Sequence, residues 1–191
     1  MCLYLIIILL IFSGANMRFD RNLVIKAQSG DKEAFAKLYY SCYKDVYGFA
    51  FYTLGSADDA ADVASDVFAD VWKEIKNLRD ADSFGSWIFR ILSSRCKKEI
   101  SRRIDRRAIC SLEEITEVPL PDSERMEEDI AESASLYSAL AELEPEERMI
   151  VVLSAIHGYK NREIAKMLGK PLGTVSSRLY RAYEKLRKRL Q

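Results

Sequence analysis

The sequence predicts an all-helical protein built from two small domains. Apolar residues recur through most of the chain with the 3.6-residue period of amphipathic helices. Runs in which β-branched and polar residues alternate, the usual mark of strands, are absent. Only 4 prolines and 8 glycines occur in 191 residues, so long helices are seldom interrupted.

Residues 1–16 differ from the rest of the chain. Their apolar run from Leu3 to Phe12 is too short to span a bilayer, and no Lys or Arg precedes it as in a signal peptide. Met17 begins a sequence typical of a soluble protein. We therefore expect Met17 to be the native first residue and residues 1–16 to be a non-native extension. The alternative is a membrane tether.

The first domain is expected over residues 17–107. A short helix over 23–28 is followed by Asp31, which caps a second helix that Gly55 ends. Ser56, with an aspartate three residues later, starts a third helix that runs to about residue 76. Its predicted buried residues are Ala60, Ala64, Val67, Phe68, Val71 and Ile75, with Val63 and Trp72 alongside them. Its other face carries Asp58, Asp59, Asp62, Asp66 and Asp70, usually a solvated pattern but also one that could dock a basic partner.

A fourth helix follows the polar loop over residues 77–82. Ser83 is its expected cap, and Phe84 and Trp87 lie on its apolar side. The helix then becomes strongly basic over residues 95–107. Aromatic side chains beside a basic helix suit stacking on unpaired bases, although both aromatics could simply belong to the core.

An acidic linker over residues 108–132 separates the two domains. Pro119 and Pro121 interrupt structure there, and acidic residues crowd it. Such a block is typical of a flexible, solvated connector. The second domain is expected over residues 133–191, with Pro145 in the first turn of one of its helices. Each domain should fold alone, because each has its own apolar faces.

The end of the chain has the pattern of a DNA-binding helix-turn-helix. A helix over 161–168 precedes Gly169, and a second helix starts near residues 173–174. Ala165, Gly169 and Val175 supply the small residue, turn glycine and β-branched anchor of the motif. The expected buried residues are Ile164, Ala165, Leu168, Val175, Leu179, Ala182 and Leu186. The candidates for phosphate and base contacts are Thr174, Ser176, Ser177, Arg178, Tyr180 and Arg181. The alternative is a solvated amphipathic hairpin.

The formal net charge is zero, which alone would argue against a nucleic-acid partner. Charge is nevertheless segregated in blocks, with bases over 95–107 and at the C-terminus and acids over 113–132. Four scattered cysteines and one histidine give no metal site of ordinary spacing, so neither metal nor cofactor is expected, and the cysteines fit a reducing cytosol. His157, just before Gly158, is expected to interact with a helix dipole.

Taken together, these segments resemble the extracytoplasmic-function (ECF) group of sigma-70 type sigma factors, the exchangeable promoter-recognition subunits of bacterial RNA polymerase. The resemblance covers residues 19–190. It rests on AFAKLYYSCY, DDAADVASDVFADVW and SFGSWIFRIL in the first domain, and on LEPEERMIVVL and YKNREIAKMLGKPLGTVSSRLYRAYEKLRKRL in the second. The family usually has an acidic residue and a glutamine at Ala61 and Ser65, an asparagine near Ser94 and an aspartate near Lys98.

The resemblance implies a cytoplasmic protein that is not an enzyme and has no small-molecule substrate. Its implied partners are core RNA polymerase, promoter DNA and an anti-sigma factor. The first domain would be region 2 and the second region 4. The implied polymerase-binding residues, which would dock on the clamp coiled coil, are Asp59, Asp62, Asp66, Phe68 and Trp72. Those that would capture the opened strand at the minus-ten element are Arg79, Phe84, Trp87, Ser94, Arg95 and Lys98. The helix-turn-helix candidates would meet the minus-thirty-five element.

Two other classes of function remain as alternatives. A helix-turn-helix regulator that never joins polymerase would not need an aspartate-faced helix followed by an aromatic and basic one. A nucleic-acid enzyme such as a recombinase would need a nucleophile with an arginine cluster, or grouped carboxylates for Mg²⁺. The aspartates over residues 58–70 instead share one exposed helix face without a partner group from elsewhere.

Overall fold

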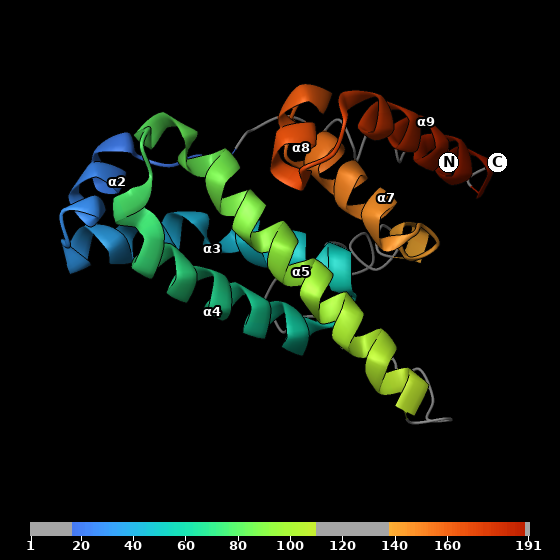
Figure 1. The fold of residues 1–191 in the computed structure, drawn as a ribbon, viewed down its shortest axis with the longest axis horizontal. Coiled ribbons are helices and arrows are strands. Elements are labelled where there is room, and N and C mark those ends of the chain that lie inside the picture. The colour runs from blue at the N-terminus through green and yellow to red at the C-terminus, as the bar shows by residue number, and fades with distance from the viewer. Residues whose placement is uncertain (1–16, 110–137, 190–191) are drawn as a thin grey trace, which may run out of the picture.

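The computed structural model describes residues 17–109 and 138–189, and every regular element in these ranges is helical, as predicted. The elements in chain order are α2 (Arg21–Gln28), α3 (Lys32–Leu54), α4 (Ala57–Glu74), the 3₁₀ turns η1 (Ile75–Asn77) and η2 (Ala81–Ser83), α5 (Phe84–Ile109), α7 (Pro145–Val151), the π-helical turn η3 (Val152–Ile156), α8 (Asn161–Leu168) and α9 (Leu172–Arg189). In Figure 1, α5 runs diagonally across the molecule, with α4 along one side and α7, α8 and α9 on the other.

In the N-terminal bundle, helices α2 to α5, the helix ends predicted at Asp31, Gly55 and Ser56 are confirmed, whereas α2 begins at Arg21, two residues earlier than predicted, with Asp20 as its cap. The Asp31 side chain accepts hydrogen bonds from two backbone amides of the first turn of α3. Gly55 ends α3 with a φ of 70°, a conformation that favours glycine. The Ser56 hydroxyl accepts a hydrogen bond from the amide of Asp59 at 3.2 Å. The six residues predicted to be buried in this segment are buried, as is Val63, although Ile75 belongs to η1 and the neighbouring Trp72 is 37% exposed.

The loop between α4 and α5 is held differently from the prediction. Ser83 is not an extended cap residue before α5 but the last residue of the 3₁₀ turn η2, and its hydroxyl donates to the Asp80 carbonyl at 2.7 Å. The Asp80 carboxylate instead accepts from the amide of Asp82 and starts the 3₁₀ turn that leads into α5. From α2, the Gln28 side-chain amide donates to the carbonyls of η1 and of Leu78, at 3.1 and 2.6 Å. These bonds fix the loop against the bundle.

The C-terminal bundle, helices α7 to α9, contains the predicted helix-turn-helix. Pro145 lies in the first turn of α7, as expected. Gly169 ends α8 with a φ of 64°, and its successor α9 begins at Leu172, slightly earlier than expected. All seven predicted buried residues of the motif are buried: Ile164, Ala165, Leu168, Val175, Leu179, Ala182 and Leu186.

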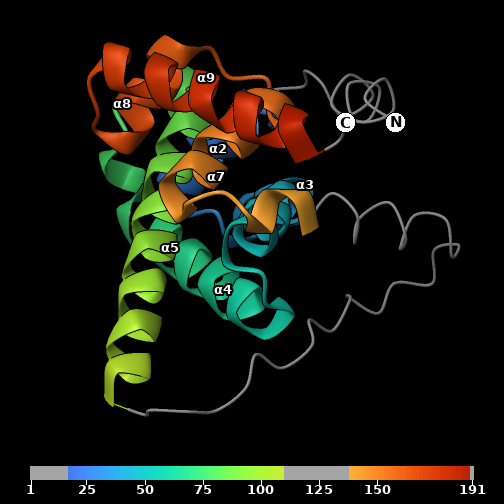
Figure 2. The same ribbon diagram turned by 90° about the vertical axis from the view of Figure 1, so that its right-hand side faces the viewer.

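The two bundles lie against each other and share one apolar core. Helix α8 packs on α5, while α7 and η3 pack on α3. Figure 2 shows α8 and α9 over the N-terminal part of α5, whose C-terminal end projects away from the other helices. The linker predicted over 108–132 and the extension predicted over 1–16 lie almost wholly outside the described residues. In 17–109 and 138–189, no helix is long and apolar enough to cross a membrane.

Gly169 ends a helix and Gly48 lies within one, so replacing each by alanine compares the same change in two backbone conformations. A Cβ at Gly169 or at Gly48, within α3, would meet no neighbouring atom within 4 Å, but only Gly169 has a positive φ. Gly169→Ala should therefore lower the free energy of unfolding by about 1–2 kcal/mol through backbone strain. Gly48→Ala should raise it by roughly 0.5–1 kcal/mol because alanine favours a helix interior. Urea unfolding followed by circular dichroism measures both, and effects of the same sign would contradict this account.

Candidate nucleic-acid interface

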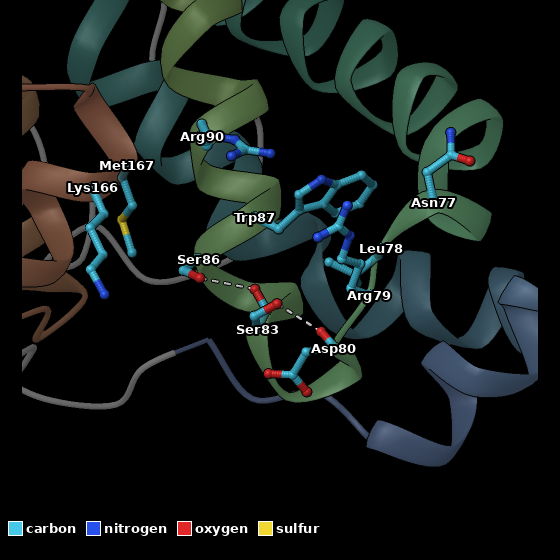
Figure 3. Close-up of a pocket in the computed structure, with 10 residues that line it drawn as sticks. All are labelled: Asn77, Leu78, Arg79, Asp80, Ser83, Ser86, Trp87, Arg90, Lys166 and Met167. Carbon is cyan, nitrogen blue, oxygen red and sulfur yellow. Dashed lines mark hydrogen bonds between the residues drawn. The ribbon is translucent and has the colours of Figure 1, made fainter.

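A pocket of about 480 Å³ opens where the loop between α4 and α5 faces α8. Its lining residues are Asn77, Leu78, Arg79, Asp80, Ser83, Ser86, Trp87, Arg90, Lys166 and Met167. Figure 3 shows Trp87 and Arg79 on one side, with Lys166 and Met167 on the opposite side. An indole beside exposed cations offers a stacking surface and phosphate contacts, which together suit a single-stranded nucleic acid.

Two predicted strand-capture residues, Arg79 and Trp87, lie in this pocket, whereas Phe84 lies behind it. Phe84 is completely buried, with its ring centroid 5.2 Å from that of Phe19 and 6.0 Å from that of Trp87. It therefore supports Trp87 and does not offer its own ring to a base. Sequence reasoning missed Arg90, although its position three residues after Trp87 places both on one helix face.

The other three strand-capture candidates lie outside this pocket. Ser94 is exposed on α5, and Arg95 and Lys98 line a separate polar groove of about 400 Å³ between α4 and α5. Arg95 binds Asp66 through Nη1 at 2.9 Å and Asp70 through Nε at 2.7 Å. The basic row of α5 thus meets the acidic row of α4, two rows that the sequence analysis assigned to different partners.

The candidate polymerase-binding residues fall into exposed and buried groups. Asp62 is exposed, and Asp66 keeps 59% of its side chain exposed despite its ion pair. Asp59 is half-buried and is bound by Arg103. Phe68 is only 4% exposed, so it belongs to the core, whereas Trp72 is 37% exposed at the end of the same helix.

A row of aromatic side chains along α3 continues the surface around Trp72. The Trp72 and Phe35 ring centroids are 4.8 Å apart. Further along α3, Tyr39, Tyr43 and Tyr47 are half-buried, and the last two stack with centroids 5.9 Å apart. Their spacing of four residues is the sequence signal that would have revealed this row.

The helix-turn-helix candidates are also divided by the structure. Ser177, Tyr180 and Arg181 are exposed, with Tyr180 at 68%. Thr174, Ser176 and Arg178 are half-buried, and the Ser176 hydroxyl accepts a hydrogen bond from the Asn161 side chain at 3.2 Å. Ser177 and Arg181 donate hydrogen bonds only to carbonyls of α9 itself, at 3.1 and 3.4 Å, so this outward-facing half of the set can approach a major groove without breaking contacts to other helices.

Glu146 of α7 holds the turn and the second helix of the motif together. Its carboxylate binds Lys170 at 2.9 Å and also Arg178. Burial alone would raise the pKa of Glu146, but the hydrogen bond from Lys170 and the neighbouring cations outweigh it and lower that pKa below 4.5. Next to it, Glu147 binds Lys185 of α9 at 2.7 Å. Arg178 is therefore engaged inside the protein, which the sequence did not reveal.

The histidine and cysteines contribute no metal site in the part of the chain that the structure describes, where no group of metal-binding side chains is found. Cys42 and Cys96 are buried free thiols, and burial raises the pKa of Cys42 to about 11. His157 does not act as a charged group at a helix end. It is only 4% exposed, and burial lowers its pKa from 6.5 to about 4, so it is neutral at pH 7.

Comparisons with known proteins match both bundles. The sequence profile of Sigma-70 region 2 matches residues 38–106, and that of Sigma-70 region 4 matches residues 133–186. The ECF RNA polymerase sigma factor SigE of Mycolicibacterium smegmatis is 34% identical over 144 residues, covering 74% of this chain but only 56% of that protein. The ECF RNA polymerase sigma factor SigM of Mycobacterium tuberculosis is 28% identical over 175 residues, covering 92% and 86% of the two chains.

Two solved structures have a similar fold across both bundles. CnrH, in complex with the cytosolic domain of CnrY, superimposes with a TM-score of 0.65 and 28% identity, covering 90% of this chain and 96% of CnrH. The sigma factor RpoE of Bartonella quintana, in complex with the anti-sigma factor NepR, gives a TM-score of 0.65 at 20% identity, covering 83% and 97%. The second likeness concerns the fold alone.

The ion pairs of Glu146 predict a pH-dependent contribution to stability. Because the folded-state pKa is below the ordinary 4.5, this contribution is present above pH 4.5 and is lost as the pH falls through the folded-state value. Glu146→Gln should lower the free energy of unfolding at pH 7 by about 1 kcal/mol, and the difference from the unchanged protein should shrink in acid. Glu33→Gln is the control, since Glu33 pairs with Lys37 but keeps 80% of its side chain exposed. Thermal unfolding from pH 3 to 7 measures both, and a pH-independent loss would contradict the ion-pair account.

Proposed function

The chain belongs to the sigma-70 family of RNA polymerase sigma factors, in its ECF group, and from this premise we propose that it binds core RNA polymerase and directs promoter recognition and transcription initiation. The observation that carries the proposal is the arrangement of two DNA-facing surfaces, one on each bundle. The N-terminal bundle corresponds to region 2 and the C-terminal bundle to region 4. The domain bounds we propose are 17–107 and 133–191, joined by the linker over 108–132.

The pocket between Arg79, Trp87 and Arg90 is the proposed site for the opened strand of the minus-ten element. Trp87 offers an indole face to an unstacked base, and the two arginines are exposed for its phosphates. Each base captured in this way stabilises the separated strands relative to duplex. Opening would then be driven by binding energy, without any bond being made or broken, so the proposed function is not enzymatic.

The surface formed by Asp62, Asp66 and Trp72 is the proposed contact with polymerase. The two carboxylates and the indole come from one face of α4, and all three side chains are exposed. The aromatic row of α3 extends this surface. Carboxylates beside aromatic rings suit a partner helix that presents both basic and apolar side chains.

The exposed face of α9 is the proposed contact with the minus-thirty-five element. The side chain of Arg181 is exposed on α9, as are those of Ser177 and Tyr180. An arginine in this part of a recognition helix can donate two hydrogen bonds to N7 and O6 of a guanine. Arg178 could do so only after leaving Glu146. We therefore assign the principal reading of bases to Arg181.

A protein partner that restrains the factor is also proposed. CnrH, at 28% identity, is bound to the cytosolic domain of CnrY. By analogy, an anti-sigma factor would bind this chain, and both would meet in the cytoplasm. The alternative function, a helix-turn-helix regulator that does not join polymerase, leaves the exposed carboxylates and indole of α4 without a purpose.

The contact with polymerase can be tested with Asp62. Asp62→Lys should weaken binding to core polymerase at least tenfold and reduce promoter-dependent transcription, because it reverses one charge in the proposed contact without removing an apolar residue. Helix content should stay normal. Asp105→Lys, on the projecting end of α5, makes the same charge change at another exposed position and should leave polymerase binding unchanged. Equal polymerase affinity of the two variants would contradict docking through α4.

Base reading can be separated from phosphate binding on α9. Arg181→Ala should weaken binding to the cognate upstream element by roughly 1–3 kcal/mol more than binding to random duplex. Lys188→Ala should weaken both alike and lower the salt dependence by about one unit of slope. Binding isotherms on both DNAs at several salt concentrations measure these effects. If Arg181→Ala reduced the two affinities equally, the helix face would not be reading bases.

A further inference from the structure

The loop between α4 and α5 carries Arg79, one of the cations that line the strand-capture pocket. The backbone bonds within the loop reach only three residues along the chain. The Leu78 amide donates to the Ile75 carbonyl at 3.1 Å, and the Ser83 amide donates to the Asp80 carbonyl at the same distance. These bonds fix the shapes of the two 3₁₀ turns, but they do not fix the position of the loop relative to α5.

Helix α2 supplies the long-range bonds that hold this loop. Nε2 of Gln28 donates to the Ile75 carbonyl at 3.1 Å and to the Leu78 carbonyl at 2.6 Å, so one amide group joins the end of α4 to the loop. Near the start of α2, Nε of Arg21 lies 3.1 Å from Oδ1 of Asp82. With 8 residues, α2 is roughly 12 Å long and packs on both η1 and η2 (Figure 1).

Gln28 is suited to this position by its chemistry. The carbonyls at the end of an α-helix lack partners within that helix, and Ile75 lies at the end of α4. A primary amide has two N–H donors and no charge, so it can satisfy two carbonyls from a half-buried position without the cost of burying an ion. The ion pair between Arg21 and Asp82 is weaker support, because 55% and 69% of the two side chains are exposed. Gln28 is therefore the principal anchor of the loop.

The segment that leads into α2 is itself packed on the start of α5. The Phe19 ring meets the Phe84 ring edge to face, with the centroids 5.2 Å apart. A Cβ on Gly85 would lie only 3.3 Å from the Phe19 ring, so the approach of this segment to α5 is close. Helix α2 is thus connected both to the helix that carries Trp87 and to the loop that carries Arg79.

The two sides of the stacking site are held by different means. Trp87 is half-buried, and its neighbours in α5, Ile88 and Phe89, are completely buried, so the core fixes the indole. Arg79 is exposed and has no ion pair among the described residues, so the backbone of the loop determines where its guanidinium lies. Figure 3 shows both side chains on the same side of the pocket. Their relative position therefore depends on how firmly α2 holds the loop.

We propose that Gln28 is a positioning residue for strand capture: through the carbonyls of Ile75 and Leu78 it holds the loop so that Arg79 lies near Trp87 before the strand binds. Gln28 does not line the pocket, so it acts without touching the strand. The inference rests on the proposed function, since it names the residue that prepares the proposed pocket for an unstacked base. A pocket held in its binding geometry loses less freedom when it binds, which increases both affinity and discrimination.

Gln28→Met tests the role of the amide, because methionine has nearly the same length and volume but no N–H group. Fluorescence anisotropy measures how the full chain binds a single-stranded minus-ten oligonucleotide and a set of copies in which each base in turn is removed. In the unchanged chain, one abasic position, that of the captured base, should weaken binding about tenfold. In Gln28→Met this penalty should fall to about threefold, and binding of the complete strand should weaken about fivefold, because Arg79 no longer has a fixed position.

Asn22→Leu is the matched control, since it replaces an amide by an apolar group of similar size at an exposed position of the same helix. It should change neither the abasic penalty nor the affinity for the complete strand. Both variants should bind duplex that contains the upstream element as the unchanged chain does, because α9 is the proposed site for that duplex. If Gln28→Met weakened binding to the duplex and to every oligonucleotide by the same factor, the amide would only stabilise the bundle, and the positioning role would be overturned.

Amide hydrogen exchange tests the anchor without nucleic acid. The Leu78 and Ser83 amides should exchange at least fivefold faster in Gln28→Met than in the unchanged chain, whereas the amides of α9 should keep their rates. Unchanged exchange in the loop would overturn the proposal. If no abasic position stood out in the unchanged chain while the loop of Gln28→Met exchanged faster, strand capture by the Trp87 pocket would be wrong, and Gln28 would still be supported as the anchor of the loop.

Discussion

Burial of the apolar face of one helix, α5, determines where both surfaces of the protein lie. Its side chains Phe84, Ile88, Phe89, Leu92 and Cys96 are completely buried, packed against α3 and α4 on one side and the C-terminal bundle on the other. Removing one large side chain of this kind typically lowers stability by 2–5 kcal/mol, a substantial part of what a domain has. The strand-capture pocket lies at the start of this helix, the ion-pair groove beside its middle, and its basic end projects beyond the other helices (Figure 2).

The zero net charge conceals an ordered distribution of ion pairs. In the N-terminal bundle the acids of α4 bind the bases of α5, and in the C-terminal bundle the acids of α7 bind the bases of α9. Each pair neutralises a cation that composition alone would assign to DNA. Arg95 and Arg178 are bound to protein carboxylates, whereas Arg90 and Arg181 are exposed. Partner choice therefore depends on which charges the fold has already neutralised.

The helices and their buried faces could be predicted from sequence because their signals are local. Asp31 and Gly55 act within one turn of the helix ends they define, and apolar periodicity identified the buried side of α4. Contacts between distant segments leave no such signal. Arg95 and Asp66 are far apart in sequence, as are His157 and Phe89, so neither the ion pair nor the interface was expected. The resemblance implied that Phe84 captures an unpaired base, and the apolar pattern left open that it belongs to the core, because periodicity does not separate a pocket wall from the layer behind it.

Gly85 illustrates a conflict between local stability and global arrangement. Within a helix, glycine is less favourable than alanine by roughly 0.5–1 kcal/mol, and a search for thermostable variants would select its replacement. At this position the missing methyl group lets Phe19 from one bundle and Tyr159 from the other approach to 3.3 and 3.2 Å of the space a Cβ would fill. Alanine at this position would therefore require the Tyr159 and Phe19 side chains to shift by a few tenths of an ångström, which opposes the gain in helix stability. Optimising the helices of this molecule one at a time would therefore act against the close packing of its two bundles.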